Sequence, residues 1–387
     1  TDQALEAKFP EFRAEAGPLR KSIAETKKKL KPKPQIRALY EMGGEPSPAY
    51  LLRRGDAQQI GEAVRPGVPS VIRAGLADYR VEPPWPGSSG RRLGLARWLT
   101  QPNHPLTSRV LVNRIWMRHF SRGIVASPAN FGRLGTPPSH PELLDWLATE
   151  FVRRGWSIKA IHRLLMTSTA YRQTSAVTPD LQKADPENIL LSRMPLRRLD
   201  AEQLHDAILS VSQELDLRAF GPPVSVEVKP AGEVLDQGTP KQGWRRAIYA
   251  LQRRTTPVTL LEAFDLPPMS PNCIQRAYST VSIQALQMTN SAFIRDRARY
   301  LAGRLLDADP ENSQRQIERL YLRALARRPA ADETQAALRD LASLERHWAS
   351  HLQNEKSAAP RQGTARWYAL ADLCHAILIS ADFTYVD

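Results

Sequence analysis

Apolar residues recur at intervals of three and four over most of the chain after residue 91, and this spacing predicts amphipathic helices. The clearest example begins at Ser139-His140-Pro141-Glu142, where serine followed three residues later by glutamate fits a capping box, with proline in the first turn. We expect this helix to end at Arg153-Arg154-Gly155, because glycine readily adopts the left-handed conformation that closes a helix. Its predicted apolar face consists of Leu143, Leu144, Leu147, Phe151 and Val152.

Two more helices have recognisable starts. Ser157 can cap the next helix, and Asp200 with Gln203 opens another. Their predicted inward positions are Ile158, Ile161, Leu164 and Leu165 in the first, and Leu204, Ile208, Val211 and Leu215 in the second. Helices are also predicted near residues 282–306, near 314–326, after Pro329 and over 366–380. Short alternating stretches over residues 220–234 and 247–251 predict a little β structure.

The N-terminal part of the chain has a different pattern. Residues 1–31 read as a polar helix that ends in the basic run Lys27-Lys28-Lys29, and Pro32 and Pro34 follow it. Residues 35–92 are rich in proline and glycine, with short β-like pieces at 49–53 and 69–73. We therefore predict an N-terminal helix over residues 1–34 that is the tail of an upstream domain, an extended strap over 35–90, and a helical domain over 91–387. The predicted fold class is mainly α, a multi-helix domain with minor β elements and an extended Pro/Gly-rich N-terminal strap.

Several sequence blocks occur in an order that resembles a known family. The longest runs from Arg91 to Ser175 and contains LARWLTQPNHPLTSRVLVNRIWMRHF, NFG and PPSHPELLDWLATEFVRRGWSIKAIHRLLMTSTAYRQTS. The others are LRRGDAQQIGEAVRPGVPSV, RRLDAEQLHDAILSVSQELD, RRAIYALQRR, LLEAFDLPP and STVSIQALQMTN. Together they resemble the planctomycete-type domain of unknown function 1553, the PSD module found at the C-terminus of large surface or periplasmic proteins.

The resemblance implies a compartment and neighbours, but no activity. It implies an exported protein, periplasmic or at the cell surface, whose upstream part carries a cytochrome c-like domain with haem. Two departures from the family pattern occur: the usual FGxG reads Phe120-Ser121-Arg122-Gly123, and the closing LNxxEF reads Leu378-Ile379-Ser380-Ala381-Asp382-Phe383. Roles that depend on the Asn and Glu of the second motif are therefore not carried over to this chain.

Composition limits the alternatives. The 387 residues, with 42% hydrophobic content, can build a sizeable core, and no run of about 18 apolar residues predicts a membrane span. The chain begins at Thr1 with a charged stretch rather than a signal peptide, so we expect it to be the C-terminal part of a longer precursor. Cys273 and Cys374 are expected to be free thiols, with a disulfide between them left open. Cys374-His375 lacks the earlier cysteine of a haem-attachment motif, so no cofactor is expected within this chain.

The charge balance is strongly basic. Lys and Arg number 54 against 40 Asp and Glu, which gives a net charge of +14, and 42 of the basic residues are arginine. Such a chain suits anionic polysaccharide, nucleic acid or an acidic membrane surface as a partner. The arginines are spread along the chain, however, so ion-pair networks or codon bias are the favoured explanation of the excess.

The best candidate ligand site is the predicted helix over 105–120. Arg109, Asn113, Arg114 and His119 alternate there with apolar residues, and Arg109 and Asn113 lie one turn apart on the same face. If they point inward, they need hydrogen-bond partners, which are a substrate carboxylate, the loop Asn130-Phe131-Gly132, or other structural groups. In the structural interpretation, Arg109 pairs with Asp145 or Glu142 and Asn113 binds a loop carbonyl. That interpretation is favoured, because no catalytic motif accompanies the helix.

Other candidates depend on single features. His140 at a helix start, with His104 and Arg133 near it in sequence, could bind an anion or a sugar, or could simply occupy an exposed first turn. His347 and His351 have metal-chelating spacing but no third ligand, so no metal site is predicted. His205 and Asp206 are expected to point in different directions and not to form a dyad. Arg54-Gly55-Asp56 is expected to form a turn in which Asp56 binds local backbone N–H groups.

Three functional hypotheses follow. The leading one is an accessory scaffold that docks upstream domains of the same precursor, including a cytochrome-like domain, or anionic surface polysaccharide. The second is a hydrolase or oxidoreductase that acts on complex carbohydrate and uses Arg109, Asn113, His140 and Asp145. The third is nucleic-acid binding by a helix pair over residues 139–169, with Lys159, His162 and Arg163 on its second helix. The expected export makes this third hypothesis the least favoured.

Overall fold

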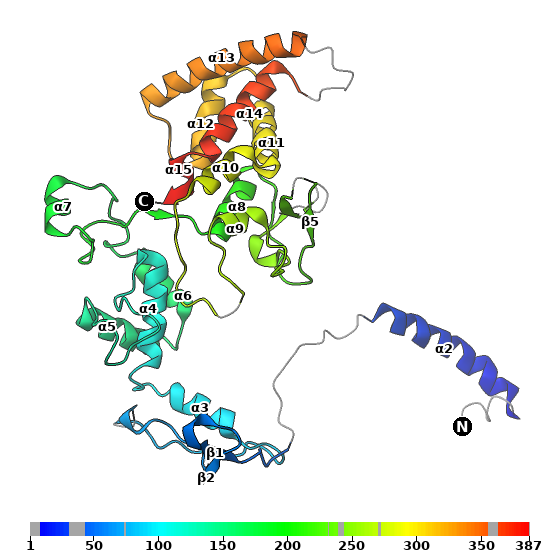
Figure 1. The fold of residues 1–387 in the computed structure, drawn as a ribbon. Coiled ribbons are helices and arrows are strands. Elements are labelled where there is room, and N and C mark those ends of the chain that lie inside the picture. The colour runs from blue at the N-terminus through cyan, green and yellow to red at the C-terminus, as the bar shows by residue number, and fades with distance from the viewer. Residues whose placement is uncertain are drawn as a thin grey trace. The chain divides into compact units, whose positions relative to one another are not determined.

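The computed structural model describes residues 8–30, 43–72, 75–230, 232–238, 244–269, 272–354 and 363–386, with the side chain of residue 354 excepted. The chain divides into two compact units, residues 1–104 and residues 105–387 (Figure 1). The described part is mainly helical with short strands, which confirms the predicted fold class.

The described part of the first unit contains two α-helices and a β-hairpin. Helix α2 (Pro10–Lys29) buries none of its side chains, and β1 (Ala49–Leu52) pairs antiparallel with β2 (Ile60–Val64). The predicted β-like piece at 49–53 is therefore confirmed over β1. The predicted strand at 69–73 is wrong where described, because residues 70–72 form a 3-10 turn, η2 (Ser70–Ile72). Helix α3 (Arg91–Leu99) follows, whereas the predicted ends of the first helix at 1–7 and 31–34 lie outside the described residues.

The Arg54-Gly55-Asp56 tripeptide lies between the strands of this hairpin. Residues 53–55 form the 3-10 turn η1 (Arg53–Gly55), and Oδ1 of Asp56 accepts a hydrogen bond of 2.9 Å from the backbone N–H of Gln58. The turn predicted for this tripeptide is confirmed, and the carboxylate of Asp56 accepts hydrogen bonds from within the hairpin.

The second unit begins with a three-helix group. Helix α4 (Thr107–Phe120) packs against α5 (Pro141–Arg153) and α6 (Ile158–Met166), and α7 (Pro179–Ala184) follows in a long connection. Ser157 caps α6 as predicted, since its hydroxyl accepts a hydrogen bond from the N–H of Ala160. The buried side chains of the group include Val112, Trp116, Phe120, Leu144, Leu147, Phe151, Ile161 and Leu165.

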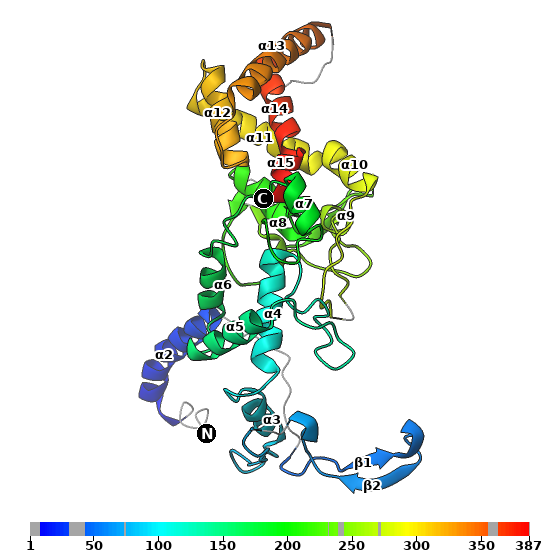
Figure 2. The same ribbon diagram turned by 90° about the vertical axis from the view of Figure 1, so that its left-hand side faces the viewer.

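The remaining helices share a second, larger core. Helix α11 packs along α14, and α14 packs against α13, an arrangement visible in Figures 1 and 2. The elements are α8 (Ala201–Val211), α9 (Thr259–Ala263), α10 (Ser282–Asn290), α11 (Ala292–Ala308), α12 (Ser313–Ala324), α13 (Ala331–Asn354), α14 (Ala365–Leu378) and α15 (Ala381–Thr384). The capping box predicted at Asp200 and Gln203 is present at the start of α8. The helix predicted near 282–306 is broken in two, because Ser291 has an extended conformation with φ −61° and ψ 125°.

Short strand pairs connect these helices. β3 (Arg197–Arg198) pairs antiparallel with β8 (Tyr385–Val386), and β5 (Val226–Val228) pairs antiparallel with β6 (Val234–Asp236). β4 (Leu215–Asp216) pairs parallel with β7 (Trp244–Arg245). The alternation at 220–234 therefore corresponds to strands in part. The stretch at 247–251 does so at one residue: residues 247–249 form the 3-10 turn η3 (Ala247–Tyr249), and Ala250 makes an isolated parallel bridge with Val224.

Candidate functional site

The polar residues of α4 contact three different parts of the second unit. Val112, Ile115, Trp116 and Phe120 of this helix are buried in the three-helix core; Asn113 and His119 lie between them in sequence, and Arg109 precedes them.

Arg109 connects α4 to α5. Its Nε donates a hydrogen bond of 2.7 Å to Oδ1 of Asp145, and its Nη1 donates one of 2.8 Å to the carbonyl oxygen of Pro105. The side chain of Asp145 is 60% exposed, so the pair is a surface salt bridge and contributes at most about 1 kcal/mol. Two acceptor oxygens of the protein therefore hold the guanidinium group in place.

Asn113 has the most complete hydrogen bonding of the predicted site residues. It is fully buried, its Nδ2 donates to the carbonyl oxygen of Val125 at 3.0 Å, and its Oδ1 accepts from the N–H of Val125 at 2.8 Å. The side-chain amide therefore pairs with the backbone of the loop after α4 as a neighbouring strand would. Gly123 allows this approach, because a Cβ atom there would lie 2.7 Å from Nδ2 of Asn113.

His119 connects α4 to α6 through a second histidine. Its Nε2 lies 2.7 Å from Nδ1 of His162, and its ring meets Tyr171 edge to face. Burial, followed by the positive potentials of His162 and Arg197, lowers the pKa of His119 below its usual value. The contact between the two ring nitrogens needs an N–H donor on one ring and a free acceptor nitrogen on the other.

His140 lies apart from these contacts, at a small cavity of about 160 Å³. It is the N-cap residue of α5 but makes no capping hydrogen bond, so the predicted capping box is wrong. Ser139, which would have capped the helix, lies one position too early. Its hydroxyl donates to the carbonyl oxygen of Ile124 at 3.3 Å and lies 2.9 Å from Nδ1 of His140.

Three non-glycine residues with positive φ line this cavity. Ser121, Asn188 and Leu191 all line it and have φ values of 64°, 51° and 55°, in the region that favours glycine. The hydroxyl oxygen of Ser121 is also buried and has no hydrogen-bond partner among the described residues. Such strain persists where surrounding packing enforces it, and it is often found at binding sites. The complete lining is Trp116, Phe120, Ser121, Arg122, Gly123, Ser139, His140, Glu187, Asn188, Ile189, Leu191 and Pro195.

The other predicted residues do not join this group. Arg114 is exposed on α4, and Asn130 is exposed in its own loop, where its Oδ1 accepts a hydrogen bond of 3.0 Å from the N–H of Gly132. His104 belongs to the first unit, where its ring packs edge-on against Trp98. The structure therefore brings Arg109 to Asp145, but it gives Asn113, His119 and His140 separate partners.

A polar cluster in the larger core was not anticipated. His205 of α8 is 2% exposed, its Nδ1 lies 3.2 Å from Oδ1 of Asp206, and its Nε2 lies 3.4 Å from Oδ1 of Asp236. The expectation that His205 and Asp206 point apart is thus wrong. The carboxylate of Asp206 turns back to the ring and also accepts the N–H of Ala247 at 2.6 Å. The sequence signal available was a histidine among the inward positions of an apolar helix face.

Charge compensation explains how His205 is tolerated in the core. Burial alone would lower its pKa, but the hydrogen bonds to Asp206 and Asp236 outweigh burial and raise the pKa to about 9. The ring also stacks parallel on Phe293 at 5.4 Å between centroids. At neutral pH the residue is therefore an imidazolium held by two carboxylates.

A second buried charge lies nearby on α11. Nη1 of Arg297 is 2.6 Å from Oε2 of Glu214, and its guanidinium lies over the rings of Trp244, Phe293 and Tyr300. Burial lowers the pKa of Arg297 and raises that of Glu214. Cation–π contacts and the ion pair together offset the cost of burying this charge.

Within the described residues, no group of three or more His, Cys, Asp or Glu could hold a metal ion. His347 and His351 stack in parallel with centroids 6.5 Å apart on α13. Cys273 and Cys374 are free, as expected, and burial raises the pKa of the Cys374 thiol. Over the same described ranges, no helix is both long and apolar enough to cross a membrane.

Comparison with known proteins identifies one family. A family model described as "PSD1: Protein of unknown function (DUF1553)" matches residues 91–341. No curated protein and no solved structure matches the chain.

Proposed function

Because this chain belongs to the DUF1553 family of proteins of unknown function, we propose its role from its own geometry: a non-catalytic accessory module of an exported multidomain protein. The observation that carries this proposal is the hydrogen bonding of α4. Arg109 is bonded to Asp145 and Pro105, and Asn113 is bonded to both backbone groups of Val125. Residues that hold helices and loops together in this way serve the fold, and they leave no shared point at which a substrate would meet all of them.

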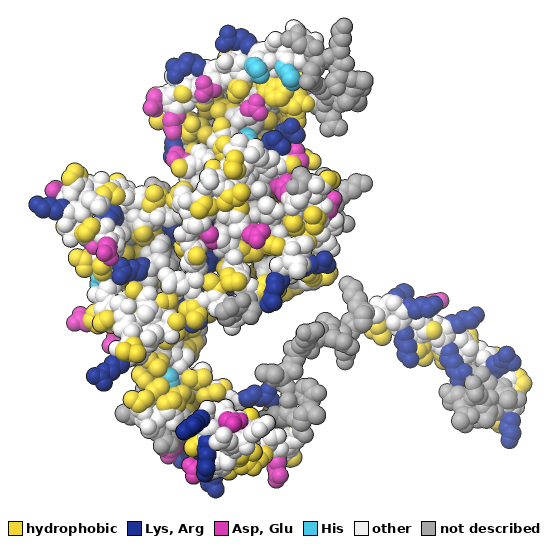
Figure 3. All heavy atoms as spheres, in the orientation of Figure 1, with side chains coloured by type: hydrophobic (Ala, Val, Ile, Leu, Met, Phe, Trp, Pro, Cys, Tyr) yellow, Lys and Arg dark blue, Asp and Glu magenta, His cyan; other side chains and the backbone are white. Residues whose placement is uncertain are grey.

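The proposed partners are upstream domains of the same precursor, including the cytochrome c-like domain implied by the family resemblance, and anionic polysaccharide at the cell surface. The net charge of +14 supports an anionic partner. Lys and Arg side chains are scattered over the visible face of the second unit rather than gathered in one patch (Figure 3). A dispersed positive surface suits an extended polymer better than a compact ligand.

An enzyme that acts on carbohydrate is the second candidate, and the cavity at His140 is the observation that favours it. The hydroxyl of Ser139 lies 2.9 Å from Nδ1 of His140, and strained residues line the same cavity. Nucleic-acid binding through α6 receives less support, since His162, one of the three side chains proposed to read bases, is engaged with His119.

Binding and hydrolysis can be measured in the same samples. The chain is mixed with heparin, polygalacturonate, uncharged dextran or duplex DNA at about 0.15 M salt, where exposed charges are screened beyond about 8 Å. We expect saturable binding to the two anionic polysaccharides, none to dextran, and no new reducing ends. Release of reducing ends that is lost in His140→Ala would overturn the non-catalytic proposal. Binding to DNA that is tighter than binding to both polysaccharides would overturn the proposed partner.

A double variant separates the role of Arg109 from catalysis. Replacing the pair by Arg109→Met and Asp145→Asn removes a surface salt bridge, so we expect a loss of less than about 1 kcal/mol in the free energy of unfolding. Polysaccharide binding should be unchanged within twofold. Glu142→Gln, on the first turn of α5, the helix that carries Asp145, is the matched control.

A further inference from the structure

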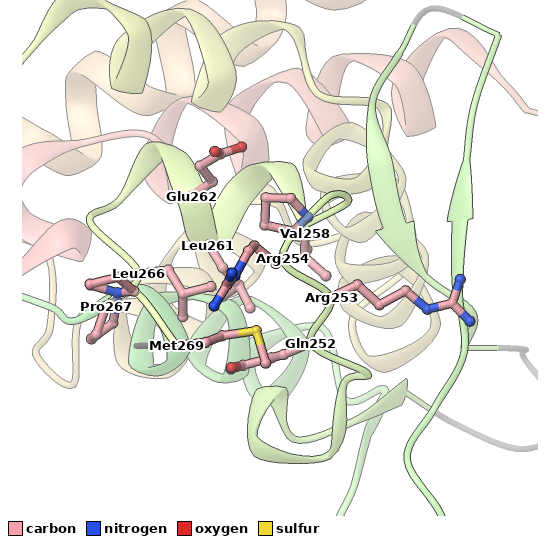
Figure 4. Close-up of a pocket in the computed structure, with 11 residues that line it drawn as sticks. Gln252, Arg253, Arg254, Val258, Leu261, Glu262, Leu266, Pro267 and Met269 are labelled. Atoms are coloured by element: carbon pink, nitrogen blue, oxygen red, sulfur yellow. The ribbon is translucent and has the colours of Figure 1, made fainter. Parts of the chain in front are cut away.

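A second, larger cavity lies in the other part of the second unit, and its volume is about 410 Å³. Its lining comes from one stretch of chain: the loop before α9, α9 itself and the proline-rich segment after it (Figure 4). Val258 and Leu261 form its inner surface and are 5% and 1% exposed, so the cavity is built on the core of the unit. The complete lining is Gln252, Arg253, Arg254, Pro257, Val258, Leu261, Glu262, Leu266, Pro267, Pro268 and Met269.

Most of these side chains are apolar, and two prolines in succession stiffen one wall. Cavities that hold small molecules in proteins occupy roughly 300–1,000 Å³, and they combine an apolar lining with a few polar groups that orient the ligand. Size and lining therefore both suit a small molecule with an apolar body.

The lining has four polar side chains, Gln252, Arg253, Arg254 and Glu262, and Arg254 is an exposed residue without an ion-pair partner among the described residues. Figure 4 shows the side chain of Arg254 lying among Leu261, Leu266 and Met269, whereas Arg253 extends away from them. Across the described ranges, no carboxylate pairs with Arg254. Arg276, later in the same unit, is by contrast held by both carboxylate oxygens of Glu202 at 2.6 Å.

The one acidic residue of the lining does not neutralise this charge. The carboxylate of Glu262 points away from Arg254 in Figure 4. The guanidinium thus lies beside an apolar cavity with its N–H donors free for an external acceptor. Guanidinium groups bind carboxylates in a bidentate geometry, which gives the exposed Arg254 a way to orient a ligand whose apolar part lies in the cavity.

We propose that this cavity binds a small amphiphilic carboxylate, with the apolar body against Val258, Leu261 and Leu266 and the carboxylate on Arg254. The site is independent of the polymer contact proposed above, because it recognises one molecule of defined size rather than an extended charge. It requires no chemistry: the ligand is held and released unchanged.

Octanoate and octan-1-ol test the proposal, since they share an alkyl body and differ in the charged group. Each is titrated calorimetrically into the purified chain at pH 7.5. We expect octanoate to bind saturably with one site per chain, and octanol to bind at least about tenfold more weakly. No saturable octanoate binding, or equal binding of octanol, would overturn the proposal.

Two variants test the assigned residues. Arg254→Met keeps an unbranched aliphatic stem and removes the guanidinium and its charge, so octanoate affinity should fall about tenfold or more while octanol affinity stays the same. Met269→Glu introduces a carboxylate beside Arg254 at a position that is 55% exposed, and should abolish octanoate binding by occupying the guanidinium. Arg339→Met, at an exposed position of α13, is the matched control and should bind as the parent does.

Thermal unfolding of each variant distinguishes loss of the site from loss of the fold. If Arg254→Met and Met269→Glu unfold as the parent does and still bind octanoate with parental affinity, the assignment of Arg254 is wrong. If Arg254→Met fails to fold, Met269→Glu alone decides the question, because its side chain lies at the surface.

Discussion

Nε2 of His205 lies 3.4 Å from Oδ1 of Asp236, and the two side chains are 2% and 3% exposed. One residue belongs to α8 and the other to β6, so the contact fastens a strand of the larger core to a helix. Since the imidazole is also bonded to Asp206, its protonated form is the one that the fold stabilises.

This relationship predicts a loss of stability in mild alkali. The pKa of His205 is raised from 6.5 to about 9, so its contribution is fully present below pH 6.5 and is lost as the pH rises toward 9. We expect the free energy of unfolding to fall by about 3 kcal/mol across this range, as measured by urea denaturation. Asp236→Asn should lower the free energy of unfolding at pH 6 and make it vary less with pH, whereas Asp180→Asn on α7 should do neither. A parental curve that is flat between pH 6.5 and 9 would contradict the prediction.

Asn113 gives a prediction about the loop after α4. Asn113→Ala leaves the buried N–H and carbonyl groups of Val125 without their side-chain partners, so we expect a loss of about 2–4 kcal/mol in the free energy of unfolding. Asn130→Ala, at an exposed loop position, should change stability by less than about 1 kcal/mol. Equal effects of the two substitutions in urea denaturation would show that Asn113 does not hold the loop.

Ser121 provides a stabilising substitution. It stands where the family pattern has glycine, its φ is 64°, and its hydroxyl is buried without a partner among the described residues. Ser121→Gly should therefore raise the free energy of unfolding by about 0.5–1 kcal/mol. Ser343→Gly, in the middle of α13, should instead lower it by a similar amount, because glycine disfavours helix interiors. Thermal unfolding of both variants checks the opposite signs.

The His119–His162 pair predicts acid sensitivity. Because the pKa of His119 is lowered in the folded state, the unfolded chain binds protons first as the pH falls below 6.5, and stability declines there. His119→Gln should reduce the difference in stability between pH 7.5 and pH 5. His347→Gln, at an exposed position of α13, should leave that difference as it is. Denaturation curves at the two pH values make the comparison, and a parental difference retained in His119→Gln would refute it.

Much of the local structure could be predicted because local rules decide it. The apolar spacing of α5, α6 and α8 gave these helices, and Asp200 with Gln203 gave the start of α8. The local capping rule failed where a tertiary hydrogen bond competed with it. Ser139 had the spacing of a capping residue, but its hydroxyl found the carbonyl oxygen of Ile124, a partner from outside the helix.

The sequence by itself determined the helical class, the family and the polar residues of α4, since these depend on spacing and motif order. Only the tertiary structure decided what those residues do. From the sequence, the side chain of Asn113 could have bonded to a ligand as readily as to the backbone of Val125. His205 and Asp236 are thirty-one positions apart, and no hydrophobic periodicity predicts how the chain between them folds. The same holds for Arg254, because only the tertiary structure turns the carboxylate of Glu262, the acidic residue of the lining, away from it. Hydrogen bonds and ion pairs act over a few ångströms in space, so their partners are fixed by packing rather than by position along the chain.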